Sequence, residues 1–156
     1  MKRILLSLTL TAVAAVPFVT EASARSRGHS RTTTVQLRRT SLGKILVDGG
    51  GFTLYMFTRD RRNQDVCLRI KGCTSVWIPL RSTGATIAGR GVSARMLSSI
   101  RLPHGARQVT YGGDTLYTYT GDTRPGETSY VGQPQFGGTW PALTAADRAV
   151  TGSGGY

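Results

Sequence analysis

The sequence predicts a single, mainly β domain built from two similar halves. Three observations lead to this prediction: the chain length, the glycine content and an internal repeat. A chain of 156 residues has the length of one domain. Its 20 glycines disfavour a helical bundle, because each glycine inside a helix costs about 1 kcal/mol relative to alanine. The repeat is visible because residues 43–60 return in similar form at 105–122.

The first 24 residues have the three parts of a secretory signal peptide. Lys2 and Arg3 precede an apolar run at 4–16, and a small-residue cleavage site follows at 22–24. The run is shorter than the roughly 20 residues that a membrane-spanning helix needs. We therefore expect cleavage before Arg25 and a secreted or periplasmic protein; a retained membrane anchor is the alternative. The basic segment 25–32 is expected to be disordered.

The repeat aligns 43–60 (GKILVDGGGFTLYMFTRD) with 105–122 (GARQVTYGGDTLYTYTGD), and nine of 18 positions are identical. Each copy predicts two strands around a Gly-Gly turn; they span 45–47 and 53–57, then 108–111 and 115–119. Alternation puts Tyr55 and Phe57 on one face of their strand and Leu54 and Met56 on the other. A lone hairpin must bury its apolar face, so we expect the two copies to pack as a pseudo-symmetric pair in a small sheet or sandwich.

The remaining segments are assigned from local signals. Residues 33–39 alternate and predict an edge strand, and 81–90 reads as a connecting loop. Residues 93–100 predict the one short helix, with Ser93 as N-cap, and it would bridge the copies. The repeats are placed at about 43–80 and 105–142 of a domain spanning 33–142, with 143–156 as a C-terminal tail.

The two cysteines, Cys67 and Cys73, predict a disulfide, because an even number of cysteines in an exported chain is typical of disulfide bonding. The loop is small, so its stabilisation should be about 2 kcal/mol. We expect it at the periphery of the domain, fixing the turn that leads to Trp77. The alternative is a metal or redox pair, although the spacing C-x5-C is not that of redox sites, and only His29 and His104 could assist a metal.

These segments resemble a known family. Residues 54–60 and 116–122 both fit Y-x-[FWY]-x-x-D, and the cysteine pair is followed by Trp77-Ile78-Pro79. The chain resembles the bacterial secreted-repeat family of predicted lipoproteins with this motif, over about 33–142. The resemblance implies an exported envelope or extracellular protein with no assigned activity. Lipid anchoring is not carried over, because no cysteine lies near the predicted cleavage site. In this chain Ile78 also splits the family's Trp-Pro element.

The motif residues and their tryptophans are expected to be structural: Tyr55, Phe57, Asp60, Trp77, Tyr117, Tyr119, Asp122 and Trp140. The aspartates would accept turn N–H groups, and the aromatic residues would pack in the core. The alternatives are a carboxylate pair for acid–base chemistry or cation binding, and an aromatic platform for sugar rings. An exposed Trp140 on its glycine-rich loop would indicate a glycan or protein contact.

The net charge of +12 points to anionic partners. For an exported chain these are wall polymers, lipopolysaccharide or another envelope protein; nucleic acid is not expected. No hydrolase or nucleotide-binding motif occurs, so we expect a non-catalytic binding or structural module without metal or cofactor. The alternatives are a small redox, haem or metal carrier that uses Met56, the tyrosines and the cysteine loop, and a hydrolase built on Asp60 and Asp122. The oligomeric state stays open.

Overall fold

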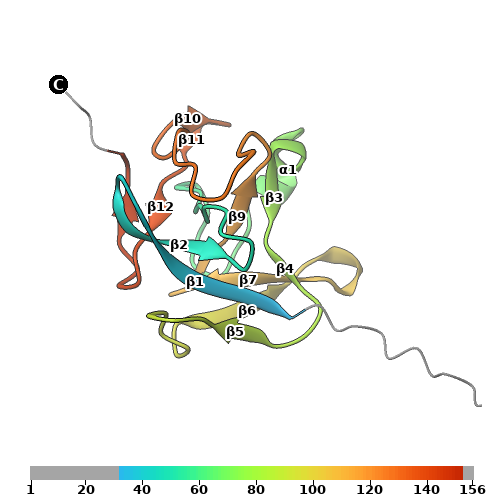
Figure 1. The fold of residues 1–156 in the computed structure, drawn as a ribbon. Helices are drawn as coiled ribbons and strands as arrows, with labels where there is room; N and C mark the ends of the chain where they lie inside the picture. The colour runs from blue at the N-terminus through green and yellow to red at the C-terminus, as the bar shows by residue number, and fades with distance from the viewer. Residues whose placement is uncertain (1–31, 153–156) are drawn as a thin grey trace, which may run out of the picture.

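The computed structural model describes residues 32–152, so the predicted signal peptide lies outside the described residues, as does nearly all of the basic segment 25–32. The chain forms short strands, two 3-10 turns and one short helix (Figure 1). In chain order the elements are β1 Thr33–Thr40, β2 Gly43–Asp48, η1 Cys67–Arg69, α1 Cys73–Val76, β3 Trp77–Pro79, β4 Arg81–Ser82, β5 Thr86–Ala88, β6 Leu97–Arg101, η2 Pro103–Gly105, β7 Arg107–Tyr111, β8 Asp114–Thr115, β9 Tyr117–Tyr119, β10 Pro134–Gln135, β11 Gly138–Thr139, β12 Ala142–Leu143 and β13 Ala149–Val150.

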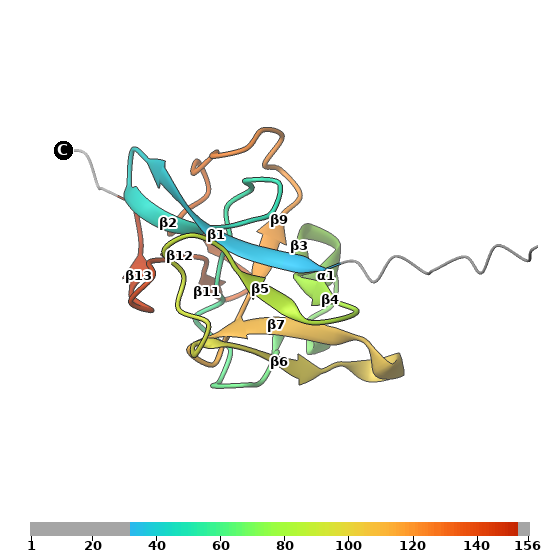
Figure 2. The ribbon, with the colours of Figure 1, turned by 60° about the horizontal axis from the view of Figure 1, so that its bottom comes forward.

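The first sheet has the order β2-β1-β5. β1 and β2 form an antiparallel hairpin whose two-residue turn is closed by the pair Thr40↔Gly43. β5 adds in parallel, but only along 33–35 of β1; Figure 2 shows the two strands side by side. The expected edge strand is therefore present, but it is the middle strand of its sheet: residues 33–35 pair with β5, residues 35–40 pair with β2, and the two ladders overlap at Val35.

A second sheet has the order β4-β7-β6, and β8 also pairs with β7. β7 is the first strand predicted around the second Gly-Gly turn, and it pairs with β8 across that turn. The second predicted strand, 115–119, is divided between β8 and β9, and β9 pairs with β3 in another sheet. Both glycines of that turn, Gly112 and Gly113, have positive φ (59° and 101°), a conformation that glycine adopts without steric penalty.

The two repeats pair at the centre of the molecule. Tyr55 and Tyr117 exchange both backbone hydrogen bonds, each with an N···O distance of 2.9 Å. On its other side Tyr55 bridges to Ala142 in β12, and Tyr117 pairs with Pro79 in β3. The motif tyrosine of each repeat thus lies between the other repeat's tyrosine and the segment that follows the other repeat's tryptophan, which confirms the predicted pairing of the copies.

The pseudo-twofold relation extends beyond these residues. Thr58 donates its N–H to Thr139 at 3.1 Å, and its counterpart Thr120 donates to Val76 at 3.0 Å. Each of these bonds joins a residue inside one motif to the residue that directly precedes the other repeat's tryptophan. The copies are therefore crossed over each other rather than stacked as two independent hairpins.

The alternation of residues 53–57 divides the interior into two apolar clusters. Tyr55 and Phe57 belong to an aromatic cluster with both tryptophans and the cysteine pair. Leu54 is buried in an aliphatic cluster with Leu46, Val109, Leu116 and others, and Met56 packs against it. Both clusters draw on both repeats, so neither repeat has a core of its own.

The helix predicted at 93–100 is wrong. Residues 93–97 form only consecutive turns, with Met96 N–H donating to Ser93 and Leu97 N–H to Ala94, and β6 follows at once. All five residues of β6 pair with β7. An isolated helix of eight residues is marginal in water, so strand pairing outweighs its weak local preference. Within residues 32–152 the one short α-helix is α1, which begins at the second cysteine of the disulfide.

Three further expectations need correction. The disulfide does not lie at the periphery, because Cys67 and Cys73 are fully buried in the aromatic cluster. The segment expected as a connecting loop contains β4 and β5. The segment after Ala142 is not a tail over its described part: Leu143 is fully buried and β13 pairs with β12.

Within residues 32–152 the structure contains no helix of the length and apolarity required to cross a membrane.

Candidate functional site

The two motif tyrosines and the two motif aspartates form crossed pairs. The Tyr55 hydroxyl donates to Asp122 Oδ2 at 2.9 Å, and the Tyr117 hydroxyl donates to Asp60 Oδ2 at 2.6 Å. Each hydrogen bond joins the tyrosine of one repeat to the aspartate of the other. The motif Y-x-[FWY]-x-x-D is therefore satisfied only between repeats.

Asp60 is the better satisfied of the two carboxylates. Its Oδ1 accepts the N–H of Val66 at 2.7 Å, and its Oδ2 also accepts the hydroxyl of Thr115. Asp122 accepts only the Tyr55 hydroxyl among the described residues, and its buried Oδ1 has no partner there. The sequence indicated that both aspartates accept N–H groups in turns. In the structure Asp60 accepts the N–H of Val66, just before the cysteine loop, whereas the Asp122 side chain accepts the Tyr55 hydroxyl.

Burial governs the protonation of these groups. Desolvation raises the pKa of Asp122 to about 6, against the smaller opposing effect of the Tyr55 hydrogen bond. Desolvation also raises the pKa of Asp60 and of Asp65. The pKa of both tyrosines is raised, mainly by burial and then by the facing carboxylate. The tyrosines therefore act as neutral hydrogen-bond donors.

The aromatic residues form a stack that crosses the pseudo-twofold axis. Trp77 and Trp140 lie parallel at its centre, 3.8 Å between ring centroids. Phe57 stacks on Trp140 at 4.2 Å, and Tyr119 lies on Trp77 at 4.7 Å. The aromatic residue of each motif thus covers the tryptophan of the other repeat.

Edge contacts complete this arrangement. Tyr55 meets the edge of Trp77 at 5.1 Å, and Tyr117 meets Trp140 at 5.2 Å. Both tryptophans are fully buried, so the exposed tryptophan that would have indicated a glycan contact is not observed. Tyr119 is half-buried and contacts Tyr130 at 4.4 Å, so the stack is open to solvent only at this end.

Several partners of the motif escaped the sequence analysis. Gln135 binds both indoles: its Oε1 accepts Trp77 Nε1–H at 2.8 Å and its backbone carbonyl accepts Trp140 Nε1–H at 3.2 Å. Thr115, which binds Asp60, is one of the positions identical in the two copies, and that identity is a signal that could have found it. No comparable signal marks Gln135.

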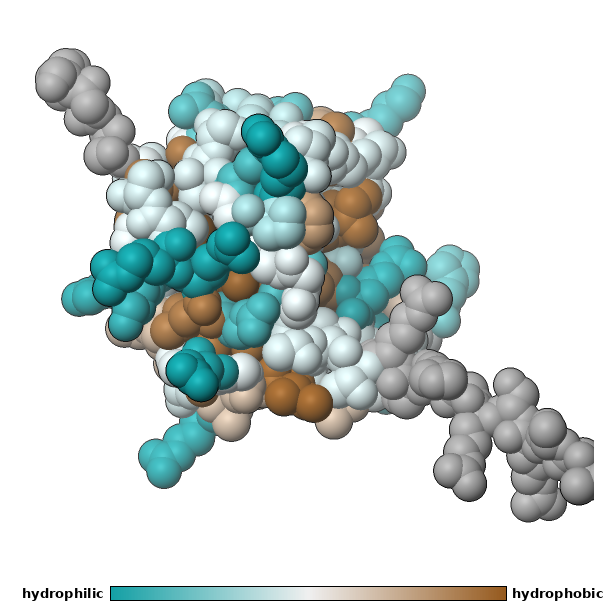
Figure 3. All heavy atoms as spheres, in the orientation of Figure 1, coloured by the Kyte–Doolittle hydropathy of each residue, from teal (hydrophilic) through white to brown (hydrophobic). Residues whose placement is uncertain are grey.

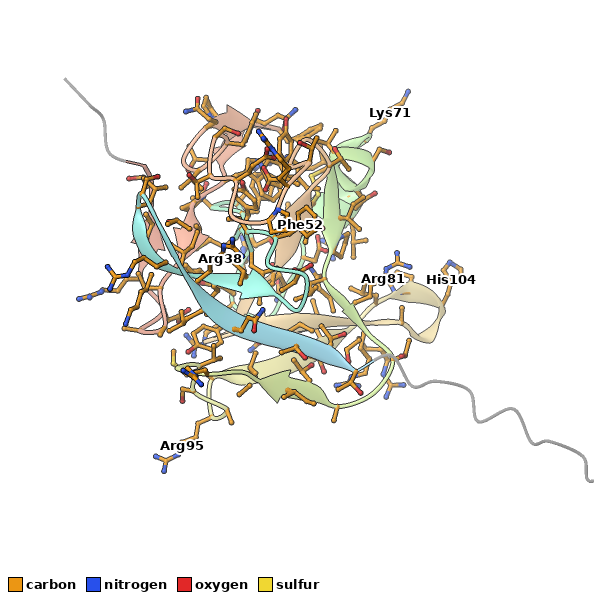
Figure 4. The ribbon with its side chains drawn as sticks, viewed as in Figure 1. Arg38, Phe52, Lys71, Arg81, Arg95 and His104 are labelled. Atoms are coloured by element: carbon orange, nitrogen blue, oxygen red, sulfur yellow. A yellow bond between two sulfur atoms is a disulfide. The ribbon has the colours of Figure 1, made fainter. Side chains whose placement is uncertain are left out.

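The other residues considered for chemistry are engaged or exposed. Cys67 and Cys73 form the predicted disulfide, with Cα atoms 5.5 Å apart. Met56 packs against the aliphatic cluster. His104 is exposed on the turn before β7 and projects into solvent (Figure 4). Across 32–152, no three His, Cys, Asp or Glu side chains gather in a group that could hold a metal ion.

Charge is sorted by sign between surface and interior. Every Lys and Arg among the described residues is exposed, and every Asp and Glu is buried or half-buried. The one ion pair in that part of the chain joins Arg124 to Glu127 at 3.2 Å. Arg81, Arg95 and Lys71 extend into solvent on different sides of the molecule (Figure 4). The fully exposed charges of the described residues are therefore all cationic, and one of them belongs to an ion pair.

One shallow cavity is lined mainly by these cations. It measures about 160 Å³ and is formed by Leu37, Arg38, Arg39, Lys44, Arg90 and Gly91; we call it the cationic groove. In the space-filling view, hydrophilic atoms gather at the left over β1 and β2 (Figure 3). No acidic residue lines the groove.

The comparisons identify the two repeats as copies of one family unit. A family model described as a secreted repeat of unknown function (Lipoprotein_15) matches twice, at residues 37–81 and 98–144. No curated protein and no solved structure matches the chain. The two matched ranges include both crossed tyrosine–aspartate pairs and both tryptophans. The chain therefore belongs to this family of secreted repeats of unknown function.

Proposed function

We propose that this protein is an exported, non-catalytic module that binds anionic components of the cell envelope through its cationic surface. The observation that carries the proposal is the sorting of charge: among the described residues the cations are exposed and the acidic groups are covered. A surface of one sign attracts polyanions by a long-range field. The secreted character of the family makes envelope polymers the available anions.

The interior use of the carboxylates strengthens this field. Asp60 and Asp122 bind tyrosine hydroxyls between the repeats, and Asp65 binds the N–H of Leu68. Asp48 accepts the N–H groups of Gly50 and Phe52 in the first glycine turn. Because these groups are held by internal donors, they do not pair with the exposed arginines.

The same contacts support a non-catalytic role. A general acid or base must reach its substrate, whereas Asp122 and the tyrosine hydroxyls are buried between the repeats. Asp60 and Asp122 also lie in separate hydrogen-bonded pairs rather than facing each other. Their arrangement favours the structural role over the paired-carboxylate hydrolase.

The test is retention on isolated cell-envelope material as the salt concentration is raised. The purified mature protein should be retained at low salt and released as salt increases, because exposed charges are screened over about 10 Å at 0.1 M ionic strength. Envelope material from which the anionic polymers have been extracted serves as the control and should not retain the protein. Failure to bind untreated material at low salt would contradict the proposal.

A further inference from the structure

We propose that the cationic groove is a binding site for a phosphate-bearing polymer, with Arg39, Lys44 and Arg90 converging on one phosphate group. This inference rests on the proposed function and names the chemical class of the anion and the part of the surface that selects it. The groove is distinguished from the rest of the cationic surface by three features of its construction.

The first feature is a like-charged pair inside a hairpin. Arg39 and Lys44 are directly opposite in the β1–β2 register, so their side chains lie on the same face. Like charges at opposed positions destabilise a hairpin, and no acidic residue lines the groove to offset them. A bound anion between them would remove this repulsion.

The second feature is the fixed position of Arg90. The turn that carries it is held to β1 by a hydrogen bond from Gly89 N–H to Val35 O, 2.7 Å long. Gly91, with φ of 79°, lies so close to Leu37 that an added Cβ would be 2.8 Å from Leu37 Cδ1. The turn is therefore packed onto the floor of the groove, and Arg90 is presented from a third direction beside Arg39 and Lys44.

The third feature is Arg38, which adds charge without being free to move. A Cβ added at Gly126 would lie 2.7 Å from Arg38 Nε, and one added at Gly51 would lie 3.0 Å from its Nη1. Arg38 thus packs over two glycine turns, one from each repeat, which are joined by a hydrogen bond from Gly126 N–H to Gly51 O (Figure 4). Because side chains alternate along β1, the Arg38 side chain lies on the opposite face from Arg39 and Lys44, so it adds to the local positive field without contacting the anion that the other three bind.

The geometry favours phosphate over carboxylate. Donors approach from β1, from β2 and from the turn at residues 89–91. A tetrahedral phosphate presents oxygens in several directions, and the arginine fork bonds two of them at once. A carboxylate presents its two oxygens in one plane and suits a single fork better.

The surroundings favour a polymer over a lipid surface. The exposed large apolar side chains of the described residues are Leu68, Ile78 and Ile87. They come from η1, β3 and β5, and none of them lines the groove. The large apolar residue that does line it, Leu37, is half-buried against the turn at Gly91. A membrane-binding face would place apolar side chains next to its cations.

The test compares two triple variants that remove the same charge. R39Q/K44Q/R90Q removes two arginines and one lysine from the groove. The control R61Q/R95Q/K71Q removes two exposed arginines and one exposed lysine outside it. The probe is long-chain inorganic polyphosphate, with affinity measured at constant salt. The groove variant should bind about tenfold more weakly or worse, since it loses three charge-assisted contacts, and the control should lose less than about threefold.

The outcomes separate this inference from the proposed function. Equal losses in the two triple variants would overturn the groove while leaving the diffuse cationic surface intact. If the unmodified protein binds no polyanion at low salt, both proposals are overturned. Polyglutamate bound as tightly as polyphosphate, with the same loss in the groove variant, would overturn phosphate as the class. Phosphatidylglycerol vesicles bound in place of polyphosphate would overturn the polymer in favour of a lipid surface.

Discussion

The loops that lead from the motif aspartate to the tryptophan differ completely between the repeats, although both deliver the tryptophan to equivalent positions. In repeat one the loop from Asp60 to Trp77 contains two short helical turns and a buried disulfide. In repeat two the loop from Asp122 to Trp140 contains no cysteine among its residues and instead forms the β10–β11 hairpin. The comparison teaches that the motif constrains the ends of the loop, where the repeats touch, and leaves its interior free.

The comparison also shows two ways to close such a loop. Repeat one uses a covalent bond, and Asp60 accepts the N–H of Val66. Repeat two uses polar groups: Glu127 accepts the N–H of Thr123 and pairs with Arg124, and Gln135 receives both indole N–H groups. The following changes test how far the two halves are equivalent.

The largest effect is expected at the shared tryptophan stack. Trp77→Ala and Trp140→Ala should each lower the free energy of unfolding by about 3–5 kcal/mol, because each removes a fully buried indole. Their equivalent positions in the stack predict similar losses. Urea unfolding provides the measurement, and the neighbouring Ile78→Ala, at a side chain that is 40% exposed, is the control. A large loss for one tryptophan alone would break the equivalence of the repeats.

The disulfide should come next. Replacing both cysteines, as Cys67→Ala with Cys73→Ala, should lower the free energy of unfolding by about 2 kcal/mol, because the loop regains conformational freedom in the unfolded chain. Glu127→Gln should have a smaller effect, since its ion pair is exposed to solvent. Thermal unfolding of both variants measures the contrast. If Glu127→Gln proved the more destabilising, the covalent loop would not be the stronger closure.

The crossed hydrogen bonds should show the asymmetry between the two aspartates. Tyr55→Phe removes the one described donor to Asp122 and should cost about 1–3 kcal/mol. Tyr117→Phe should cost less, because Asp60 keeps Val66 and Thr115. A double-mutant cycle of Tyr55→Phe with Asp122→Asn measures the coupling. Zero coupling would mean that the hydroxyl contributes only through its packing.

The smallest effect concerns pH. The pKa of Asp122 is raised to about 6 in the folded protein, so the folded state binds a proton that the unfolded state has released. The contribution of Asp122 to the free energy of unfolding is therefore complete at pH values below its pKa in the unfolded chain, near 4. That contribution is lost as the pH rises through 6, and it is on the order of 1 kcal/mol after solvent screening. The raised pKa values of Asp60 and Asp65 act in the same direction.

Thermal midpoints between pH 4 and 7 measure this dependence, which should show the protein gaining stability as the solution is acidified to pH 4. Asp122→Asn should flatten the slope between pH 4 and 6. A slope of the opposite sign, with stability rising with pH, would show that charged Asp122 is favoured by the fold.

The sequence predicts the centre of this structure better than its margins. The repeat and the alternation of 53–57 were sufficient for the β class, for the division of side chains between two clusters and for the pairing of the copies, which the structure confirms. The predicted strand 53–57 itself is reduced to isolated bridges at Thr53 and Tyr55. These features follow from local periodicity and from the need of a hairpin to bury its apolar face. The signal was strong because the same pattern occurred twice.

The errors occurred where non-local contacts decide the structure. Residues 97–101 became a strand because β7 offered a partner over their full length, which a local reading of Ser93–Ile100 does not reveal. The buried position of the disulfide depends on the stacking of the tryptophans. The crossing of tyrosine and aspartate between repeats likewise needs the fold, because spacing within one motif does not say which aspartate each tyrosine meets.

The cationic groove is an intermediate case. The two-residue turn between Thr40 and Gly43 would have placed Arg39 opposite Lys44 on sequence evidence alone. The position of Arg90 depends on β5 and on the turn that follows it, which were assigned to a loop. Total charge therefore indicated the class of partner, whereas the convergence of three cations required the three-dimensional structure.

The crossed repeats also bear on how such a chain could arise. A chain with one repeat would have a tyrosine without its aspartate, a tryptophan without its stacking partner and a tyrosine strand without its neighbours. It could satisfy these contacts only in a two-fold symmetric homodimer, because the bonds between the repeats are reciprocal. Joining the two genes end to end, through the segment that now carries β4, β5 and β6, would place both halves of that dimer in one chain. Once the subunits are fused, each loop is free to diverge, as the disulfide on one side and the hairpin on the other record.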